Sequence, residues 1–226
     1  MTSPTARRIA VGADEVTALE YAASGSAHAH LVLAHGAGAD QRHRVMVALA
    51  RGIAADGVGV TTFNFLYTER RRKSPDRAPV LIDTWRAVVD DVMARLDSTV
   101  RVVIGGKSMG GRMASMALAE PTSPALARVS GLVLLGYPLH PPGKPEQLRT
   151  AHLPQLRVPV LLVHGTRDAF GTRAEIEPVF RSLPTRVDFE FIEDGDHSFA
   201  VPKSRGLSET AVLAAISARV AGWVRG

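Results

Sequence analysis

The sequence has no cysteine, few aromatic residues and no long apolar run. The absence of cysteine excludes disulfide bonds and thiolate metal sites. Phenylalanine, tryptophan and tyrosine together make up 5% of the chain, and no motif interleaves them with basic residues, so nucleic-acid binding is not favoured. No stretch approaches the roughly 18 apolar residues of a membrane helix, and residues 1–10 lack the apolar core of a signal peptide. We therefore expect a cytoplasmic protein that does not bind membranes.

The residues that are present are typical of a globular protein. The chain has 226 residues, 46% of them hydrophobic, which suits one domain spanning 1–226 with a substantial core. The net charge is +5, and the run RRRK at residues 70–73 carries much of it. Two interpretations of this run stay open: a solvated loop, or a basic rim that attracts anionic substrates.

Short apolar runs alternate with amphipathic segments, which favours an α/β fold. Residues 7–11 and 18–23 suit an opening antiparallel hairpin, and further strands are predicted at 31–34, 58–65, 100–104, 129–137, 158–163 and 186–192. Helices are predicted at 41–55, 83–96, 109–120, 173–182 and 208–224, with Asp83 as an N-cap. This order predicts a three-layer α/β/α sandwich with a mainly parallel sheet. The proline-rich segment 139–155 is too short for a cap domain, and we expect it to cover part of a pocket.

The most informative stretch is GGKSMGGR at residues 105–112, which contains a Gly-x-Ser-x-Gly pattern centred on Ser108. It follows a predicted strand and opens a predicted helix. A serine at such a sharp turn is how one large class of hydrolases exposes a nucleophile, and glycines two residues away on either side relieve steric clashes there. Gly106-Lys107-Ser108 also resembles the end of a phosphate-binding loop, but Arg101 stands where that loop requires its first glycine.

An acid, a base and oxyanion donors follow other predicted strands. In this class the order along the chain is serine, then an acidic residue, then histidine, and Asp168 and His197 fit that order. Asp196 is the alternative acid, but adjacent residues on a turn rarely face each other, which favours Asp168. The turn HGAGAD at 35–40 places the backbone N–H of Ala37 as one oxyanion donor. The N–H of Met109, at the start of the helix, is the other.

Further side chains are weaker candidates. Lys107, Tyr137 and Phe199 are predicted to contribute to substrate binding, with Lys107 facing solvent beside the pocket; ordinary core packing is the alternative for the two aromatic residues. We expect structural roles for the two histidines that follow buried strands, His35 and His164. The remaining histidines lack metal-ligand spacing, so no metal site is expected; they are His28, His30, His43, His140 and His152.

The chain resembles the α/β-hydrolase superfamily over nearly its whole length, most closely its small, lidless, dienelactone-hydrolase-like branch. Four motifs carry the resemblance, in order and each after a predicted strand: HGAGAD (35–40), GGKSMGGR (105–112), VHGTRD (163–168) and GDHSF (195–199). The resemblance implies the nucleophile Ser108, the acid Asp168 and the base His197. Dienelactone hydrolases themselves use a cysteine nucleophile, which this chain lacks.

Two functions are therefore weighed. The first is a carboxylesterase-like serine hydrolase that acts on a small-molecule acyl ester through an acyl-enzyme and needs no cofactor. The second is a non-catalytic scaffold or interaction protein that keeps the fold. The complete set of Ser108, Asp168 and His197, with both donor turns, favours the enzyme.

Overall fold

One mixed sheet runs through the structure, a computed structural model that describes residues 3–25 and 27–226. The strands are β1 (Thr5–Val11), β2 (Asp14–Tyr21), β3 (Ala29–Ala34), β4 (Gly59–Phe63), β5 (Arg101–Lys107), β6 (Leu132–Leu135), β7 (Val160–Gly165) and β8 (Val187–Ile192). Their order across the sheet is β1-β2-β4-β3-β5-β6-β7-β8. Strand β2 is antiparallel to both of its neighbours, and from β4 to β8 every pairing is parallel.

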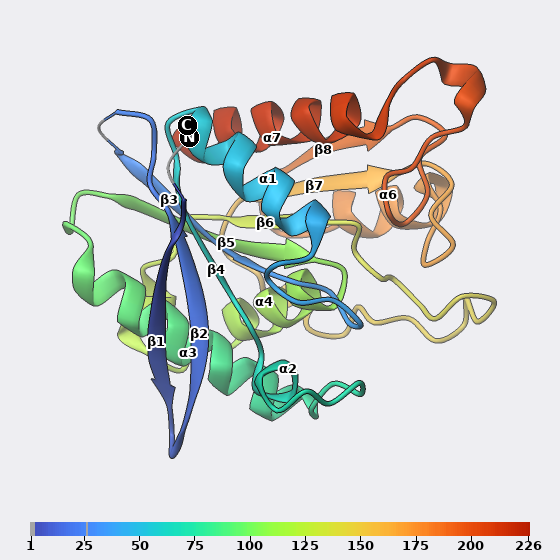
Figure 1. The fold of residues 1–226 in the computed structure, drawn as a ribbon. Coiled ribbons are helices and arrows are strands. Elements are labelled where there is room, and N and C mark those ends of the chain that lie inside the picture. Colours follow the sequence, from blue (N-terminus) through green and yellow to red (C-terminus); the bar gives the residue numbers. More distant parts are fainter. Residues whose placement is uncertain (1–2, 26) are drawn as a thin grey trace.

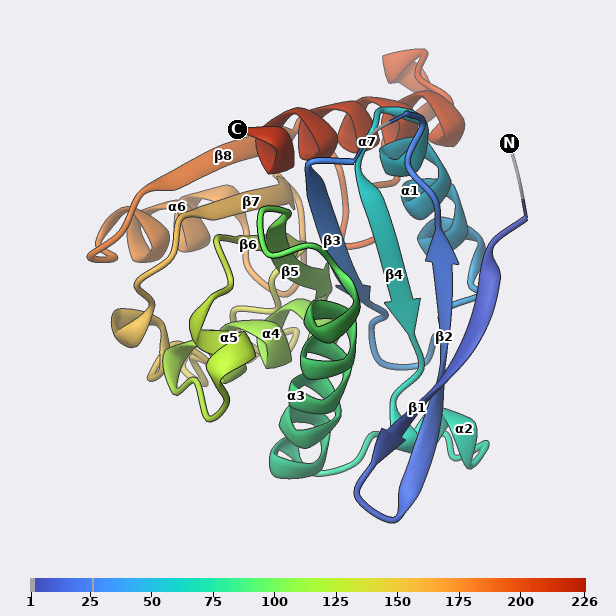
Figure 2. The ribbon, with the colours of Figure 1, turned by 90° about the vertical axis from the view of Figure 1, so that its left-hand side faces the viewer.

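Helices cover both faces of this sheet (Figures 1 and 2). They are α1 (Arg44–Ala55), α2 (Leu66–Glu69), α3 (Ala78–Arg95), α4 (Met109–Ala119), α5 (Pro124–Ala127), α6 (Arg173–Arg181) and α7 (Glu209–Arg225), with 3-10 turns at Leu153–Gln155 and Lys203–Arg205. Helices α1 and α7 pack on one face through residues such as Leu49 and Ile216. Helices α3, α4 and α6 pack on the other, where Trp85 and Phe180 are fully buried. The predicted three-layer α/β/α sandwich is confirmed.

The prediction for the start of α3 is wrong. The helix begins at Ala78, five residues before the predicted N-cap Asp83, and Arg77 is the N-cap. Proline is favoured in the first turn of a helix because its missing N–H has no partner there, and Pro79 occupies that turn. Asp83 lies inside the helix and pairs with Arg86 at 3.0 Å.

The connection between β6 and β7, residues 136–159, contains one short 3-10 turn and no cap domain. It runs over the edge of the sheet at which the parallel strands end (Figure 1). Among the described residues, no helix combines the length and apolar character needed to cross a bilayer. The carboxyl ends of β3, β5 and β7 thus meet beside an uncapped loop region, where crevices for ligands form in open α/β sheets.

Candidate active site

Ser108 occupies a sharp turn between β5 and α4. Its backbone has φ 51° and ψ −117°, a conformation that residues other than glycine rarely adopt. The Ser108 N–H donates to the carbonyl of Leu135 on β6 at 3.0 Å, which fixes the turn against the neighbouring strand. The sheet therefore holds this serine in a strained position at its carboxyl edge.

The glycines around Ser108 allow the turn to pack tightly. A Cβ atom on Gly106 would lie 2.6 Å from the backbone of Gly110, and one on Gly110 would lie 2.5 Å from the carbonyl oxygen of His35. Both contacts are with backbone, which cannot rotate away. The motif glycines are thus required by the close approach of β3, β5 and α4.

Replacing Gly110 with alanine is expected to destabilise the fold by about 1–3 kcal/mol, the usual cost of overpacking a tight interior. Gly222 supplies the matched control, since it lies in α7 with no atom within 4 Å of the site of a new Cβ. Gly222→Ala should stabilise by about 0.5–1 kcal/mol because alanine is the better helix former. Thermal unfolding of both variants measures the contrast, and equal effects would contradict the steric argument.

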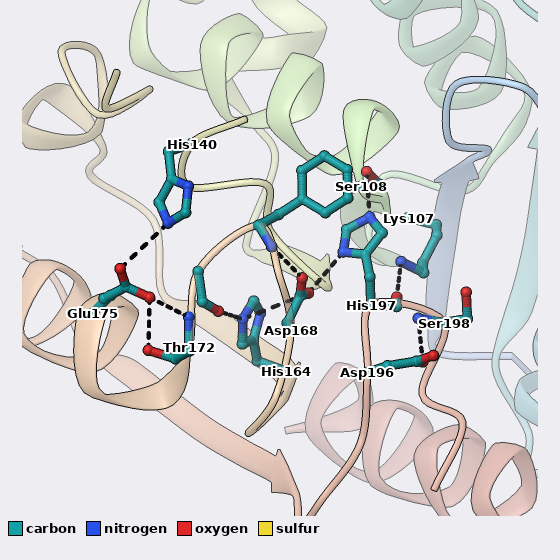
Figure 3. Close-up of polar contacts among 12 residues, drawn as sticks. Lys107, Ser108, His140, His164, Asp168, Thr172, Glu175, Asp196, His197 and Ser198 are labelled. Carbon is teal, nitrogen blue, oxygen red and sulfur yellow. Dashed lines mark hydrogen bonds and ion pairs between the residues drawn. The ribbon is translucent and has the colours of Figure 1, made fainter. Parts of the chain in front are cut away.

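Three side chains from separate loops form one hydrogen-bonded chain (Figure 3). His197 Nε2 lies 2.8 Å from Ser108 Oγ, and His197 Nδ1 lies 2.7 Å from Asp168 Oδ2. An ionised carboxylate can only accept, so Nδ1 carries the proton and donates, which leaves Nε2 to accept from the serine hydroxyl. The structure thus brings together the three residues that the sequence motifs single out.

Asp168 is fully buried after β7. Burial raises the pKa of its carboxyl, but hydrogen bonds from His197 and from the Phe170 N–H, the latter at 2.8 Å, outweigh this and lower the pKa below its ordinary value. The alternative acid, Asp196, accepts instead from the N–H groups of Ser198 and Ala200 and shapes its own loop. Of the two carboxylates, only Asp168 is hydrogen-bonded to the imidazole.

The predicted oxyanion donors lie beside Ser108. Ala37 and Met109 line the same cavity of about 490 Å³ as Ser108 and His197. A Cβ atom on Gly36 would be 3.4 Å from the Cβ of Ser108, so the turn after β3 packs directly against the serine. The two backbone segments named by the sequence therefore flank one space next to the serine hydroxyl.

The two histidines that follow β3 and β7 are buried and hydrogen-bonded locally. His35 Nδ1 donates to the Gly36 carbonyl at 2.8 Å, and His164 Nε2 donates to the Gly171 carbonyl at 2.6 Å. Burial lowers the pKa of both rings below the ordinary value, which favours their neutral forms. In residues 3–25 and 27–226, no three His, Asp or Glu side chains gather as a metal site would require.

A family model described as an alpha/beta hydrolase domain matches residues 27–225. The chain belongs to the alpha/beta hydrolase family. Its fold is similar to that of dienelactone hydrolase from Anabaena variabilis, with 20% identity, a TM-score of 0.74, and coverage of 98% of this chain and 97% of that one. A serine hydrolase without a lid from Xanthomonas campestris is 19% identical, with a TM-score of 0.77 and coverage of 100% and 97%. Est1E from Butyrivibrio proteoclasticus, solved with ferulic acid bound, is 12% identical, with a TM-score of 0.77 and coverage of 97% and 99%.

The sequence suggested that Lys107 faces solvent beside the pocket. In the structure of this alpha/beta hydrolase it does not. It lines the cavity, and its Nζ donates to the backbone carbonyl of His197 at 2.5 Å (Figure 3). The same Nζ lies over the ring of Phe199. Burial lowers the pKa of Lys107 to about 8, against the opposing effect of Asp168 and Asp196. The ammonium group is thus engaged in holding the loop that carries His197.

The expectation that Tyr137 and Phe199 line the pocket is wrong. Both are 1% exposed and lie outside the cavity lining. Tyr137 packs against Phe180, and its hydroxyl donates a hydrogen bond to the carbonyl of Arg149 at 2.5 Å. The ring face of Phe199 lies against the ammonium group of Lys107. Both side chains therefore belong to the core and do not form a wall of the cavity.

Sequence reasoning missed three residues that line the cavity of this alpha/beta hydrolase. The ring of Phe170 lies 4.2 Å from that of His197, centroid to centroid, and holds the imidazole in place. Arg112, in the first turn of α4, and Arg149, in the loop after β6, also line the cavity. Two of them had a sequence signal, since Phe170 lies two residues after Asp168 and Arg112 ends the GGKSMGGR motif, whereas Arg149 had none.

The basic run at 70–73 lies outside the cavity lining. Arg70 pairs with Asp14 at 2.7 Å, and Arg72 pairs with Asp76. Both arginines are exposed, and their acidic partners neutralise two of the four positive charges of this run locally. Of the two interpretations, the solvated loop fits the structure.

The Lys107 contact predicts opposite responses of activity and stability to pH. Above pH 8 the ammonium loses its proton, so its hydrogen bond to the His197 carbonyl weakens and kcat/KM for an ester should decline. Because folding lowers this pKa from 10.5, the folded state binds fewer protons than the unfolded state between about pH 8 and 10.5, and the contribution of Lys107 to the free energy of unfolding rises there.

Lys107→Met should remove both trends at once. Its kcat/KM should be lower than that of the wild type at pH 7 and should lack the decline near pH 8. Initial rates and chemical unfolding from pH 6 to 10, compared between the two proteins, measure the difference. Parallel pH profiles would show that Lys107 does not act on the histidine loop.

Proposed function

We propose that this alpha/beta hydrolase is a serine esterase that cleaves small-molecule acyl esters through an acyl-enzyme. One observation carries the proposal: Ser108, held in a strained turn, is hydrogen-bonded to His197, which is hydrogen-bonded to the buried Asp168. A serine hydroxyl is a weak nucleophile unless a positioned base removes its proton. This arrangement supplies that base and the carboxylate that orients it.

In the proposed mechanism, Ser108 Oγ attacks the ester carbonyl carbon while its proton passes to His197 Nε2. Asp168 keeps the other ring nitrogen protonated and stabilises the imidazolium. The carbonyl oxygen becomes an oxyanion, which accepts hydrogen bonds from the N–H groups of Ala37 and Met109. Met109 begins α4, whose dipole also favours negative charge at that point.

Collapse of the tetrahedral intermediate breaks the bond to the alcohol oxygen, which takes the proton from His197 and leaves as the alcohol. Water then attacks the carbonyl carbon of the Ser108 ester while His197 accepts its proton. His197 returns this proton to Ser108 Oγ as the bond between that oxygen and the acyl carbon breaks, and the carboxylic acid is released. His197 thus acts as base and acid in turn. None of these steps uses a cofactor or metal ion, and the reacting partner is a small ester rather than a macromolecule.

Labelling with a fluorophosphonate probe tests the proposal against the alternative of a non-catalytic scaffold. The probe phosphonylates serines that a neighbouring base has activated, so mass spectrometry should locate the adduct on Ser108. Ser198 lies in the same cavity and serves as an internal control, since it should stay unmodified. A protein that takes up no label at native pH, yet is folded by circular dichroism, would favour the scaffold.

The uncapped cavity predicts a preference for short acyl chains. With a volume of about 490 Å³ and no cap domain over it, the cavity offers little apolar surface to a long chain. We expect kcat/KM to be highest for 4-nitrophenyl acetate or butyrate and to fall by about tenfold or more for the palmitate, whose extra methylenes stay in water. A maximum at long chain lengths, or activation at an oil–water interface, would contradict this.

A further inference from the structure

The cavity beside Ser108 contains positive charge without a matching carboxylate. Lys107, Arg112 and Arg149 line it, and its lining includes no aspartate or glutamate. Elsewhere, arginines are commonly paired, as Arg95 is with Asp91 and Glu20. Charged side chains that lose water inside a cleft normally find a partner of opposite sign. The missing partner therefore calls for an explanation.

Lys107 is already engaged by the His197 carbonyl, so the two guanidinium groups remain. Within 3–25 and 27–226, neither Arg112 nor Arg149 forms an ion pair with a carboxylate. The Nε of Arg112 is buried and has no hydrogen-bond partner among those residues. Arg112 thus has no carboxylate partner and at least one unsatisfied donor.

The two arginines come from segments that are fixed to one another. The Arg149 N–H donates to the Leu139 carbonyl at 2.8 Å, and the Arg149 carbonyl accepts from Tyr137 Oη at 2.5 Å. Farther along the same loop, His152 Nε2 lies 2.7 Å from Ser115 Oγ on α4, the helix that carries Arg112. The loop is therefore held against α4, so the backbone positions from which the two arginines extend into the cavity are fixed relative to one another.

Placing two cations together costs free energy in the empty protein. Burial, and then the charge of Arg112, lower the pKa of Arg149 below its ordinary value. Burial and the same charge lower the pKa of His152 to about 4, which leaves that ring neutral near pH 7. An anion between the guanidinium groups would reverse this cost, and the planar fork of donors on arginine matches the two oxygens of a carboxylate.

We propose that Arg112 and Arg149 form a subsite for a carboxylate carried by the ester substrate. The proposal rests on the proposed esterase function, because it places that carboxylate in the cavity where Ser108 attacks. It gives Arg112 and Arg149 the role of attracting anionic substrates, which the sequence analysis had considered for the run at 70–73. A free carboxylate on the ester would be bound while its acyl carbon lies against the serine.

Paired substrates test the proposal. On the acyl side, mono-4-nitrophenyl adipate is compared with 4-nitrophenyl hexanoate, in which a methyl group replaces the carboxylate. On the alcohol side, 4-acetoxybenzoate is compared with 4-methylphenyl acetate. We expect the charged ester of at least one pair to have the higher kcat/KM, and this advantage to shrink as salt is added because screening weakens it. No advantage in either pair would overturn the proposal.

Variants then assign the advantage to its residues. Arg112→Gln and Arg149→Gln should each lower kcat/KM for the charged ester by about ten- to a hundredfold, the effect of losing a charge-assisted hydrogen bond, and change the neutral analogue by less than about threefold. Arg128→Gln removes the same group at an exposed position outside the cavity and should change neither ester. Equal losses for both esters, or a similar loss in Arg128→Gln, would contradict the subsite.

Binding separates this proposal from the esterase function. Calorimetry with adipate needs no turnover, and we expect binding to the wild type that is weakened about tenfold or more in Arg112→Gln and in Arg149→Gln. Turnover of the neutral esters without adipate binding or a charged-ester advantage would reject the subsite and leave the esterase standing. Adipate binding through these arginines in a protein without fluorophosphonate labelling would reject the esterase and keep the anion site.

Discussion

Replacing Ser108 with alanine is expected to lower kcat for ester hydrolysis by about 10⁴-fold or more, because the covalent route depends on this one oxygen. His197 would keep its hydrogen bond to Asp168 but would have no hydroxyl from which to take a proton. Residual turnover would come from water attacking within the oxyanion site that we propose for Ala37 and Met109. The fold should persist, since the backbone bonds of the turn do not involve the side chain.

The measurement is kcat with 4-nitrophenyl acetate, together with a thermal unfolding curve for each protein. Ser130→Ala is the matched control, because it removes the same hydroxyl from an exposed position distant from the cavity and should keep wild-type kcat. Wild-type turnover by Ser108→Ala would place the nucleophile elsewhere and remove the proposed mechanism. Loss of activity accompanied by unfolding would instead be resolved by Ser108→Cys, whose thiol keeps a nucleophile at the same turn.

The parts of this protein that could be predicted from sequence are those set by short-range rules. The alternation of apolar runs and amphipathic segments predicted the three-layer fold, and the glycines around Ser108 predicted the sharp turn that the structure contains. Each of these features depends on residues a few positions apart. The strand order also brings the three loops that carry Ser108, His197 and Asp168 to one edge, where these residues form a hydrogen-bonded chain; their catalytic roles stay a prediction.

The features that were missed depend on contacts between distant segments. Lys107 is next to Ser108 in sequence, but its partner, the His197 carbonyl, comes from a loop 90 residues away. Arg112 and Arg149 acquire their significance only when the loop after β6 is fixed against α4. The sequence instead singled out the basic run at 70–73 as a possible site for anions. In the structure, two of its four cations are paired with acids.

The burial of Tyr137 and Phe199 could not be predicted from sequence either. An aromatic residue after a strand that ends at the active edge can either line the pocket or complete the core, and the sequence does not distinguish the two. Here both side chains are buried: Tyr137 donates to the loop carbonyl of Arg149, and Phe199 lies against Lys107 at the end of β5. They therefore act on the cavity through the residues they support.

Asp168→Asn is expected to reduce kcat by about 10⁴-fold, as in other triads where the same change reverses the imidazole tautomer. Asp168 Oδ2 now accepts from His197 Nδ1, while Oδ1 accepts from the Phe170 N–H. In the variant the Phe170 N–H keeps the amide oxygen, so the amide NH₂ faces Nδ1 and favours the proton on Nε2. Nε2 would then be a donor toward Ser108 and could not serve as its base.

Asp196→Asn tests whether this effect is specific. The carboxyl of Asp196 accepts from Ser198 and Ala200 N–H groups, and an amide oxygen can replace it in both bonds. We therefore expect kcat to change by less than about tenfold, because neither the imidazole tautomer nor the charge facing His197 Nδ1 is altered. Steady-state kinetics of the two variants, with circular dichroism to confirm folding, give the comparison. The reverse ranking would transfer the role of the acid to Asp196. The charge that stabilises the imidazolium would then come from the loop that carries His197 and not from the residues after β7.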